Sequence, residues 1–137
     1  MAELHGYFVY SETAKGNFNF RLKASNKETI AVSEGVFKTK SACLNGIKSV
    51  INFCATENVD DQSLQRKSDD KVKFPKFEIY LDKQGKYRYR LYANNGNLLC
   101  ISEEGYASRT SCKNGIASVG KWAPTAVIVS DAEFNGK

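Results

Sequence analysis

Residues 16–50 read GNFNFRLKASNKETIAVSEGVFKTKSACLNGIKSV, and residues 85–119 read GKYRYRLYANNGNLLCISEEGYASRTSCKNGIASV. Aligned without a gap at a constant shift of 69, the two segments are identical at thirteen of thirty-five positions. Such a duplication indicates that each half is one supersecondary unit, which buries its apolar face against the other half. The chain is therefore a tandem repeat. The duplication by itself indicates no biochemical activity.

Each half first shows the period-two pattern of β-strands. Apolar and polar residues alternate strictly from Asn17 to Ala24 and again from Lys86 to Ala93, which predicts one half-buried strand in each half. Stretches rich in β-branched and aromatic residues flank these strands and predict two more strands in each half. These stretches are Tyr7 to Ser11 and Thr29 to Ser33 in the first half, and Phe77 to Leu81 and Leu98 to Ser102 in the second. Turn residues between them, such as Asn95-Gly96, favour antiparallel hairpins.

The hydrophobic period then changes to about 3.6, the period of an amphipathic helix. Ser41 in the first half, and either Thr110 or Ser111 in the second, are the candidate N-caps. Gly46 and Gly115 lie on the apolar stripe, where glycine costs on the order of 1 kcal/mol of helix propensity. We therefore expect the helix backbone to come close to the sheet or to the other helix there. The apolar stripes are Cys43, Ile47, Val50 and Cys54, and Cys112, Ile116, Val119 and Ala123.

A short strand is expected after each helix. Pro124 ends the second helix, and Thr125 to Val129 has strand composition, whereas the matching Thr56 to Asp60 predicts a weaker strand. The stretch from Asp61 to Lys71 has the polar composition of a linker. We expect a mobile tail from Asp131. The prediction is a single domain, residues 1–137, with repeat one at about 6–60, a linker at about 61–73 and repeat two at about 74–131.

Composition favours a folded chain with one shared core. The chain has 137 residues, 42% of them hydrophobic, and this length is too short for two independent domains. It has no run of roughly 18 apolar residues that could cross a bilayer. Its start lacks the basic and apolar regions of a signal peptide. We expect a cytoplasmic protein without membrane contact.

Cysteine and histidine usage does not favour a metal site. Cys43, Cys54, Cys100 and Cys112 have no metal-type spacing and no close pair, so we expect reduced thiols. Cys43 and Cys112 lie on the helix stripes and are expected to be small buried hydrophobic residues, with Cys100 more exposed. The single histidine, His5, argues against a histidine-based metal site or catalytic triad. We predict neither a metal nor a cofactor.

Two motifs recur in both halves. They are Ser33-Glu34-Gly35 with Cys43-Leu44-Asn45-Gly46-Ile47, and Glu104-Gly105-Tyr106 with Cys112-Lys113-Asn114-Gly115-Ile116. Together with the strand pair Phe77-Glu78-Ile79-Tyr80 and Tyr87-Arg88-Tyr89-Arg90-Leu91, these motifs resemble the YegP-like family of uncharacterised small bacterial proteins. The resemblance covers both halves of the chain.

The resemblance implies an α+β fold of two tandem βββαβ repeats related by a pseudo-twofold axis. Such a fold forms one antiparallel sheet with two helices packed on one face, and the last strands are exchanged between the repeats. No catalytic residue and no cofactor follow from it, because the family carries no established activity. The first half departs from the pattern at Lys27, where the second half has the turn glycine Gly96.

The alternating strands also sort their residues by face. If the apolar residues of the two alternating strands point at the helices, the residues between them form an open, basic sheet face, on which we also expect Tyr10 and Tyr80. Arginines interleaved with tyrosines are typical of single-stranded nucleic-acid binders. The formal net charge of +5 agrees with this in sign. The candidate residues are Arg21, Lys23, Lys86, Arg88, Arg90 and Tyr92.

Two other interpretations of the chemistry stay open. Exposed sheet faces are usually polar, and Glu12, Glu78 and Asp82 could form cross-strand ion pairs with these cations, which would make the face ordinary solvated surface. The chain could also dock a protein partner through its edge strands or its paired helices, since strand addition needs only an open edge.

Positions repeated in both helices are interpreted as structural. We expect the side chains of Asn45 and Asn114 to be buried and to hydrogen-bond the adjoining strand or loop backbone, because buried amides need partners. The repeat-equivalent structural positions are Cys43, Asn45, Gly46, Cys112, Asn114 and Gly115.

We predict a non-catalytic binding or adaptor module that interacts with an unidentified protein partner. Nucleic-acid binding through the basic, tyrosine-bearing sheet face is the alternative. A second alternative is a small anionic ligand at the repeat interface, which requires Arg21 and Arg90 to meet Glu34 and Glu103. An enzyme is the weakest class, because no phosphate loop, nucleophile elbow or converging acidic pair is present. We expect a monomer, because the tandem repeat supplies what a single unit would take from a dimer.

Overall fold

The computed structural model describes residues 5–62 and 73–135. The elements of the first repeat are β1 (Tyr7–Glu12), β2 (Phe18–Lys23), β3 (Thr29–Ser33), α1 (Lys40–Phe53) and β4 (Val59–Asp61). Those of the second are β5 (Lys76–Leu81), β6 (Tyr87–Tyr92), β7 (Leu98–Ser102), α2 (Arg109–Trp122) and β8 (Val127–Ser130), followed by α3 (Asp131–Phe134). The α+β fold of two βββαβ repeats is thereby confirmed.

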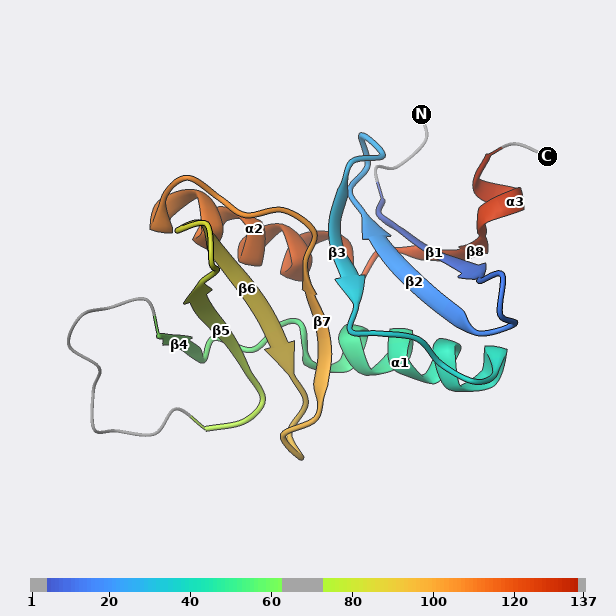
Figure 1. Cartoon of the computed structure of the whole chain (residues 1–137), viewed down its shortest axis with the longest axis horizontal. Coiled ribbons are helices and arrows are strands. Elements are labelled where there is room, and N and C mark those ends of the chain that lie inside the picture. The colour runs from blue at the N-terminus through green and yellow to red at the C-terminus, as the bar shows by residue number, and fades with distance from the viewer. Residues whose placement is uncertain (1–4, 63–72, 136–137) are drawn as a thin grey trace.

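The eight strands form one sheet in the order β4-β5-β6-β7-β3-β2-β1-β8 (Figure 1). The last strands are exchanged, because β4 of the first repeat pairs with β5 of the second, and β8 of the second repeat pairs with β1 of the first. Both of these edge pairs are parallel, whereas the six inner strands are antiparallel. The prediction of an antiparallel sheet was therefore wrong at both edges. A tight hairpin forces the two strands that it joins to be antiparallel. The strands β4 and β8 each follow a helix, so no hairpin constrains their direction.

The two repeats join through the antiparallel pair β3 and β7. Val32 pairs with Ile101, Ala31 with Ser102, and Ser33 with Cys100. Since Ile101 is the repeat equivalent of Val32, this register is symmetric about a point between these two residues. The register and the strand order are therefore symmetric about the centre of the sheet.

The turns account for most of the hairpin boundaries. Gly16, Gly85 and Gly96 all have positive φ, between 78° and 85°, which glycine adopts without steric cost. Lys27 has φ 72° at the position equivalent to Gly96 and is the one positive-φ residue other than glycine in the described part of the chain. Lys27, which departs from the repeat pattern, therefore occupies a backbone conformation that favours glycine.

Both long helices pack on the same face of the sheet, α1 against β2, β6 and β7, and α2 against β3 and β6. Their N-caps are Thr39, whose side chain accepts the N–H of Ala42, and Ser108, whose side chain accepts the N–H of Ser111. The predicted caps at Ser41, and at Thr110 or Ser111, were therefore wrong. Several Ser and Thr residues precede each apolar stripe, and local sequence does not choose among them.

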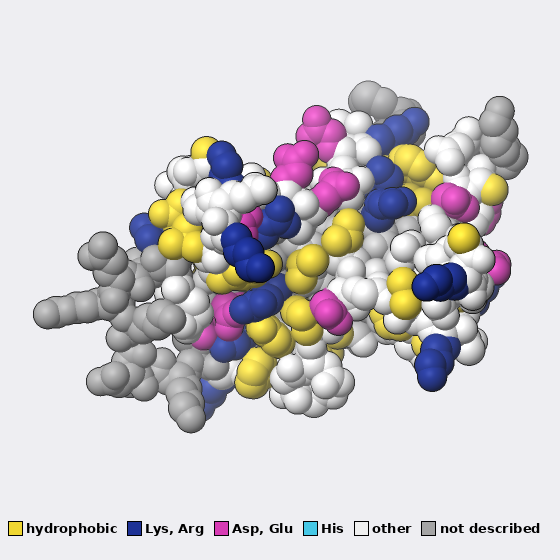
Figure 2. Space-filling model, viewed as in Figure 1, with side chains coloured by type: hydrophobic (Ala, Val, Ile, Leu, Met, Phe, Trp, Pro, Cys, Tyr) yellow, Lys and Arg dark blue, Asp and Glu magenta, His cyan; other side chains and the backbone are white. Residues whose placement is uncertain are grey.

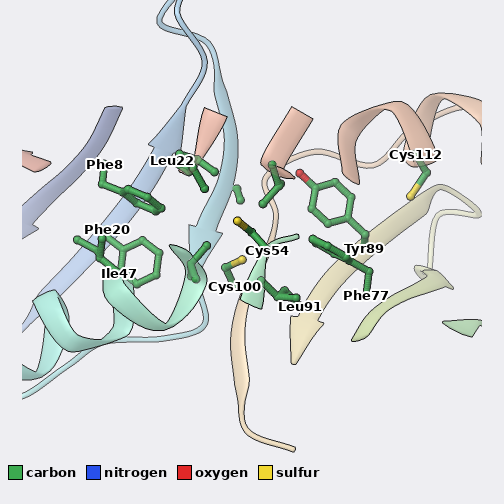
Figure 3. Close-up of a cluster of buried hydrophobic side chains, with 14 of the residues drawn as sticks. Phe8, Phe20, Leu22, Ile47, Cys54, Phe77, Tyr89, Leu91, Cys100 and Cys112 are labelled. Atoms are coloured by element: carbon green, nitrogen blue, oxygen red, sulfur yellow. The ribbon is translucent and has the colours of Figure 1, made fainter. Parts of the chain in front are cut away.

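The core is continuous across both repeats (Figure 3). Cys54 and Cys100 lie between the two groups of aromatic and aliphatic side chains that the repeats contribute. All four cysteines are buried and free, which confirms the expectation for Cys43 and Cys112. The expectation that Cys100 is more exposed was wrong, because it points at the helices in the register shared with Leu91.

Other expectations about the ends of the repeats also needed correction. The first residue of the predicted linker, Asp61, belongs to β4, and residues 63–72 of that linker lie outside the described residues. The predicted mobile tail from Asp131 begins as α3, where Ser130 and Glu133 form a capping box. The aromatic ring of Phe134 in this short helix contacts the ring of Tyr7.

Candidate functional site

The face of the sheet opposite α1 and α2 is covered by neither long helix, and we call it the open face. It points toward the viewer in Figures 1 and 2. One row of directly paired residues crosses all eight strands on this face, and we call it the open-face row. In strand order from β4 to β8 it is Asp60, Glu78, Arg90, Ile101, Val32, Arg21, Val9 and Val129.

The centre of the open-face row is apolar. Val32 and Ile101 are both half-buried and lie at the centre of the symmetric strand order, with Arg21 on one side and Arg90 on the other. Figure 2 shows hydrophobic side chains across the middle of this face, bordered by Lys, Arg, Asp and Glu. The surface therefore combines an apolar strip with flanking cations.

Two open-face arginines of the second repeat form ion pairs with carboxylates of the same chain. Arg90 donates through Nε to Oε1 of Glu78 at 2.6 Å, and Arg88 donates through Nε to Oδ2 of Asp82 at 2.8 Å. The hydrogen bond from Arg88, with backbone N–H groups, lowers the pKa of Asp82 below its ordinary value. These contacts confirm the predicted cross-strand ion pairs of Glu78 and Asp82. Glu12 was wrongly placed in that prediction, because it pairs with Phe18 on the helix face.

Aromatic rings of the second repeat enclose the same cations. The Arg90 guanidinium lies 4.2 Å from the ring centroid of Tyr80 and 6.0 Å from that of Tyr92. The Nζ of Lys76 lies 5.7 Å from the Tyr92 ring and 5.0 Å from the ring of Phe74, which is 44% exposed. The predicted interleaving of cations and rings is present, but the rings contact the protein's own cations.

The first repeat has different chemistry at the equivalent positions. Arg21 is exposed, and its neighbour in the open-face row is Val9, which stands where the second repeat has Glu78. Among the described residues no salt bridge of Arg21 is present. Lys23 donates to the Thr29 hydroxyl at 2.8 Å and lies 5.3 Å from the Phe134 ring. The open-face arginines are therefore paired with carboxylates in the second repeat, whereas Arg21 of the first repeat is not.

The predicted basic residues do share the open face, with two adjustments. Lys86 is exposed and precedes β6 by one residue. Tyr80 lies on this face opposite Arg88, whereas Tyr10 lies on the helix face, with the Nζ of Lys40 5.2 Å from its ring. The expectation for Tyr10 was wrong because β1 has two adjacent apolar residues, and its alternation does not show which of them faces the helices.

The proposed meeting of arginines and glutamates does not occur. Arg21 and Arg90 are separated by the two strands that join the repeats, which is three inter-strand steps, or about 14 Å. Glu34 and Glu103 follow β3 and β7 at opposite ends of that antiparallel pair. The geometry of an anion pocket on the axis is therefore absent from these four residues.

The repeated helix residues have separate roles. A Cβ on Gly46 would lie 2.7 Å from the Phe37 ring, and a Cβ on Gly115 would lie 2.9 Å from the Tyr89 ring and closer still to Tyr106. This confirms the predicted close packing at both glycines. Asn45 and Asn114 are exposed, so the prediction that their amides are buried was wrong. Ser33 and Ser102 instead join neighbouring strands, because their hydroxyls accept the N–H groups of Phe20 and Tyr89.

Comparison with known proteins identifies the repeat unit. The family model described as a domain of unknown function (DUF1508) matches residues 14–61 and 82–130. The chain belongs to this family. The two matches coincide with the two repeats, and the resemblance to YegP-like proteins is confirmed.

Relatives within the DUF1508 family extend over nearly the whole chain. A UPF0339 protein in the ptx operon 5' region of Stutzerimonas stutzeri is 37% identical over 121 residues, which cover 88% of this chain and 91% of that protein. The UPF0339 protein YegP of Yersinia pestis is 31% identical and covers 90% and 93%. The solution structure of yegP from E. coli, described as a protein of unknown function, superposes with a TM-score of 0.74 at 27% identity and covers 96% of this chain and 97% of its own.

One DUF1508 relative has the length of a single repeat. A UPF0339 protein of Methanosarcina acetivorans is 52% identical over 54 residues, which are 91% of that protein and 39% of this chain. The repeat is therefore a unit that also occurs by itself in the family.

The outer edge of β8 is a poor template for strand addition. The N–H of Val127 donates to the carbonyl of Gly6 and so points at β1, which leaves Ala126, Ile128 and Ser130 pointing outward. The N–H groups of Ala126 and Ser130 are already bonded, to a carbonyl at the end of α2 and to a carboxylate in α3. Of these three outward groups only that of Ile128 is left to pair, so the predicted docking at edge strands finds little support here.

Sequence reasoning missed Asp60 and Lys76. Lys76 Nζ lies 2.8 Å from Oδ2 of Asp60 and 3.8 Å from Oε2 of Glu78, which extends the ion-pair network to the edge of the sheet. The alternation in β5 could have placed Lys76 on the open face. Nothing local could have brought Asp60 beside it, because that contact depends on the strand exchange.

Neither a cluster of metal ligands nor a membrane-spanning helix is present in the described residues. Residues 5–62 and 73–135 hold no group of three or more His, Cys, Asp and Glu side chains placed to bind a metal ion. In the same part of the chain no helix has the length and apolarity needed to span a membrane.

Proposed function

We propose that this protein is a non-catalytic interaction module that binds a protein partner on its open face. The observation that carries the proposal is the apolar pair Val32 and Ile101 at the centre of the sheet, which neither long helix covers. An apolar centre with a polar and charged rim is the usual composition of a protein interface. The chain already holds both exchanged strands, so the module acts as a monomer.

Charge compensation favours a protein over a nucleic acid. Binding of a phosphate backbone depends on cations that are free to replace counterions. Arg88 and Arg90 already pair with carboxylates, and Lys76 lies between two of them. Arg21, flanking the apolar pair, is available to a carboxylate of the partner. Arginine beside an apolar contact is enriched in the centres of protein interfaces.

The test is quantitative capture of a partner on immobilised protein, followed by measurement of its Kd. The wild type is compared with the double variant Val32→Thr, Ile101→Thr, in which β-branched side chains are kept but apolar contact area is lost. We expect the double variant to bind about tenfold or more weakly, because each change removes on the order of 1 kcal/mol of apolar contact. Lys48→Gln, an exposed position on α1, is the matched control and should leave the Kd unchanged.

Anisotropy of labelled single-stranded RNA at low salt completes the test. We expect no binding at micromolar protein. Salt-dependent RNA binding that disappears in Arg21→Ala would overturn the proposal in favour of a nucleic-acid ligand. Partner binding that is unchanged in the double variant, and lost in the α1 variant, would move the interface to the helices.

A further inference from the structure

A hollow of about 270 Å³ opens on the first repeat, beside the apolar pair of the open face. It lies between β2 and the loop that follows β3 and is lined by Asn19, Arg21, Val32, Ser33, Gly35 and Val36, together with Phe20. Val36 is 56% exposed at its rim.

The second repeat fills the equivalent place with its own side chain. Arg88 is the repeat equivalent of Asn19. Its Nη1 donates to the carbonyl of Glu103 at 3.3 Å and, more weakly, toward that of Ser102 at 3.5 Å, while its Nε bonds Asp82. A guanidinium group therefore lies against the loop that follows β7. The loop that follows β3 faces the hollow instead, because asparagine is too short to reach it.

The polar chemistry of the hollow is incomplete. The side-chain oxygen of Asn19 is buried and has no hydrogen-bond partner among the described residues. A buried acceptor without a donor is unfavourable. A ligand that donates to this oxygen is therefore stabilised once the Asn19 amide turns and brings the oxygen into the hollow. A guanidinium satisfies this requirement and can reach the carbonyls of the β3 loop with its remaining N–H groups.

The charges around the hollow indicate which second charged group the ligand has. Thr13 and Val9 stand where the second repeat has Asp82 and Glu78, so the two carboxylates that neutralise the arginines there have no counterpart. Arg21 lies two residues from Asn19 on the same strand face, about 7 Å away. An extended partner chain with an acidic residue two positions from an arginine matches this spacing, and its carboxylate supplies the countercharge that Arg21 lacks.

We propose that the hollow beside Asn19 binds an arginine side chain of the partner protein, with a neighbouring acidic residue of the partner on Arg21. The guanidinium takes the position that Arg88 takes in the second repeat. This proposal rests on the function proposed above and names the chemistry of its partner.

The test is a nuclear magnetic resonance titration of the full-length protein, labelled with 15N, with the peptide acetyl-Asp-Thr-Arg-Thr-Asp-amide. We expect a Kd of about 1 mM, with shifts centred on the backbone amides of Ser33, Glu34 and Gly35. A peptide with citrulline in place of arginine keeps the shape and loses the charge, and it should shift these amides at least tenfold less.

Two variants exchange the residues at the equivalent positions 19 and 88, so that each repeat is a control for the other. Asn19→Arg fills the hollow as the second repeat does and should abolish the shifts. Arg88→Asn opens the equivalent hollow beside Asp82 and should add a second set of shifts at Glu103 and Glu104. The proposal is overturned if the wild type shows no shifts at the β3 loop, if the citrulline peptide is equivalent, or if Asn19→Arg binds as the wild type does.

Failure of this site and failure of the proposed function give different results. If Asn19→Arg retains the captured partner while Val32→Thr, Ile101→Thr loses it, the open face is the interface and the arginine site is refuted. If the peptide binds at Asn19 but the double variant retains its partner, the arginine site stands and the apolar pair is not the interface.

Discussion

Val32 lies directly opposite Ile101 where β3 meets β7, and the two residues are equivalents in the repeat. The register of β3 with β7 is symmetric about this pair. Between residues 16–50 and 85–119, which align without a gap, each difference between the repeats is therefore a substitution at one position of a common framework. Each repeat supplies a natural control for the other.

The two helix glycines give the first prediction. We expect Gly115→Ala to lower the free energy of unfolding by about 2 kcal/mol and Gly46→Ala by about 1 kcal/mol, measured by urea denaturation. The added Cβ would meet two tyrosines at Gly115 and chiefly one phenylalanine ring at Gly46. Asn45→Ala, exposed on α1, is the control and should change stability by less than about 0.5 kcal/mol. A gain of about 1 kcal/mol at Gly115, as helix propensity alone predicts, would show that the packing is looser than described.

The β2–β3 turn gives the second prediction. Lys27→Gly should raise the free energy of unfolding by about 0.5 kcal/mol, because relief of the left-handed backbone exceeds the entropy that glycine adds to the unfolded chain. Gly96→Lys should lower it, although its Cβ has room at 3.7 Å from the Phe74 ring. Thermal denaturation of both variants checks this, and equal melting temperatures in the two would refute it.

Helix capping gives the third prediction. Thr39→Ala and Ser108→Ala should each lower the free energy of unfolding by about 1 kcal/mol, because each removes an acceptor for a first-turn N–H. Ser41→Ala should have almost no effect, since Ser41 lies inside α1. Urea denaturation would contradict the assignment if Ser41→Ala proved as damaging as Thr39→Ala.

The buried thiols give the fourth prediction, a loss of stability at alkaline pH. Burial raises the pKa of Cys100 from 9.0 to about 12, and those of Cys43 and Cys112 to about 11. The folded state therefore keeps these protons while the unfolded state releases them above pH 9. The contribution of the buried thiols to the free energy of unfolding is complete below pH 9. It is lost as the pH rises toward 11 or 12. Each thiol contributes a loss of about 1.4 kcal/mol between pH 8 and pH 10.

Cys100→Ala isolates this effect, because the equivalent residue of the first repeat is Ala31. The variant should show a decline between pH 8 and pH 10 that is about 1.4 kcal/mol smaller than that of the wild type, in urea denaturation at each pH. Identical declines in the two proteins would mean that the Cys100 thiol titrates equally in both states. In native protein at pH 8, a thiol reagent should modify all four cysteines far more slowly than a free thiol.

Most patterns within a single strand or helix were read correctly from the sequence. β3 and β7 have the predicted bounds, and the apolar stripe correctly gave Cys43, Ile47 and Val50 as the buried side of α1. Errors arose where local signals were degenerate. The strand β1 has Phe8 and Val9 side by side, so alternation could not assign its faces. Two capping residues stood near the start of α1, and the backbone selected the earlier one.

Only part of the candidate site could be predicted from the sequence, for a related reason. Alternation placed Arg21, Arg88 and Arg90 on one face, and the structure agrees. Whether an arginine is neutralised depends on its cross-strand neighbour, which is Glu78 for Arg90 and Val9 for Arg21. The hollow beside Asn19 becomes visible only when the loop after β3 is placed beside β2.

The sequence by itself determined the duplication, the three hairpin strands and one helix of each repeat, and the two faces of those strands whose residues alternate strictly. These features follow from residue spacing of two or 3.6 and from turn chemistry, which are local. Only the tertiary structure decided that β3 pairs with β7, that the last strands are exchanged, and which cations of the open face meet carboxylates. These contacts join segments far apart in the chain, so their energies depend on the packed sheet and leave no pattern in the local sequence.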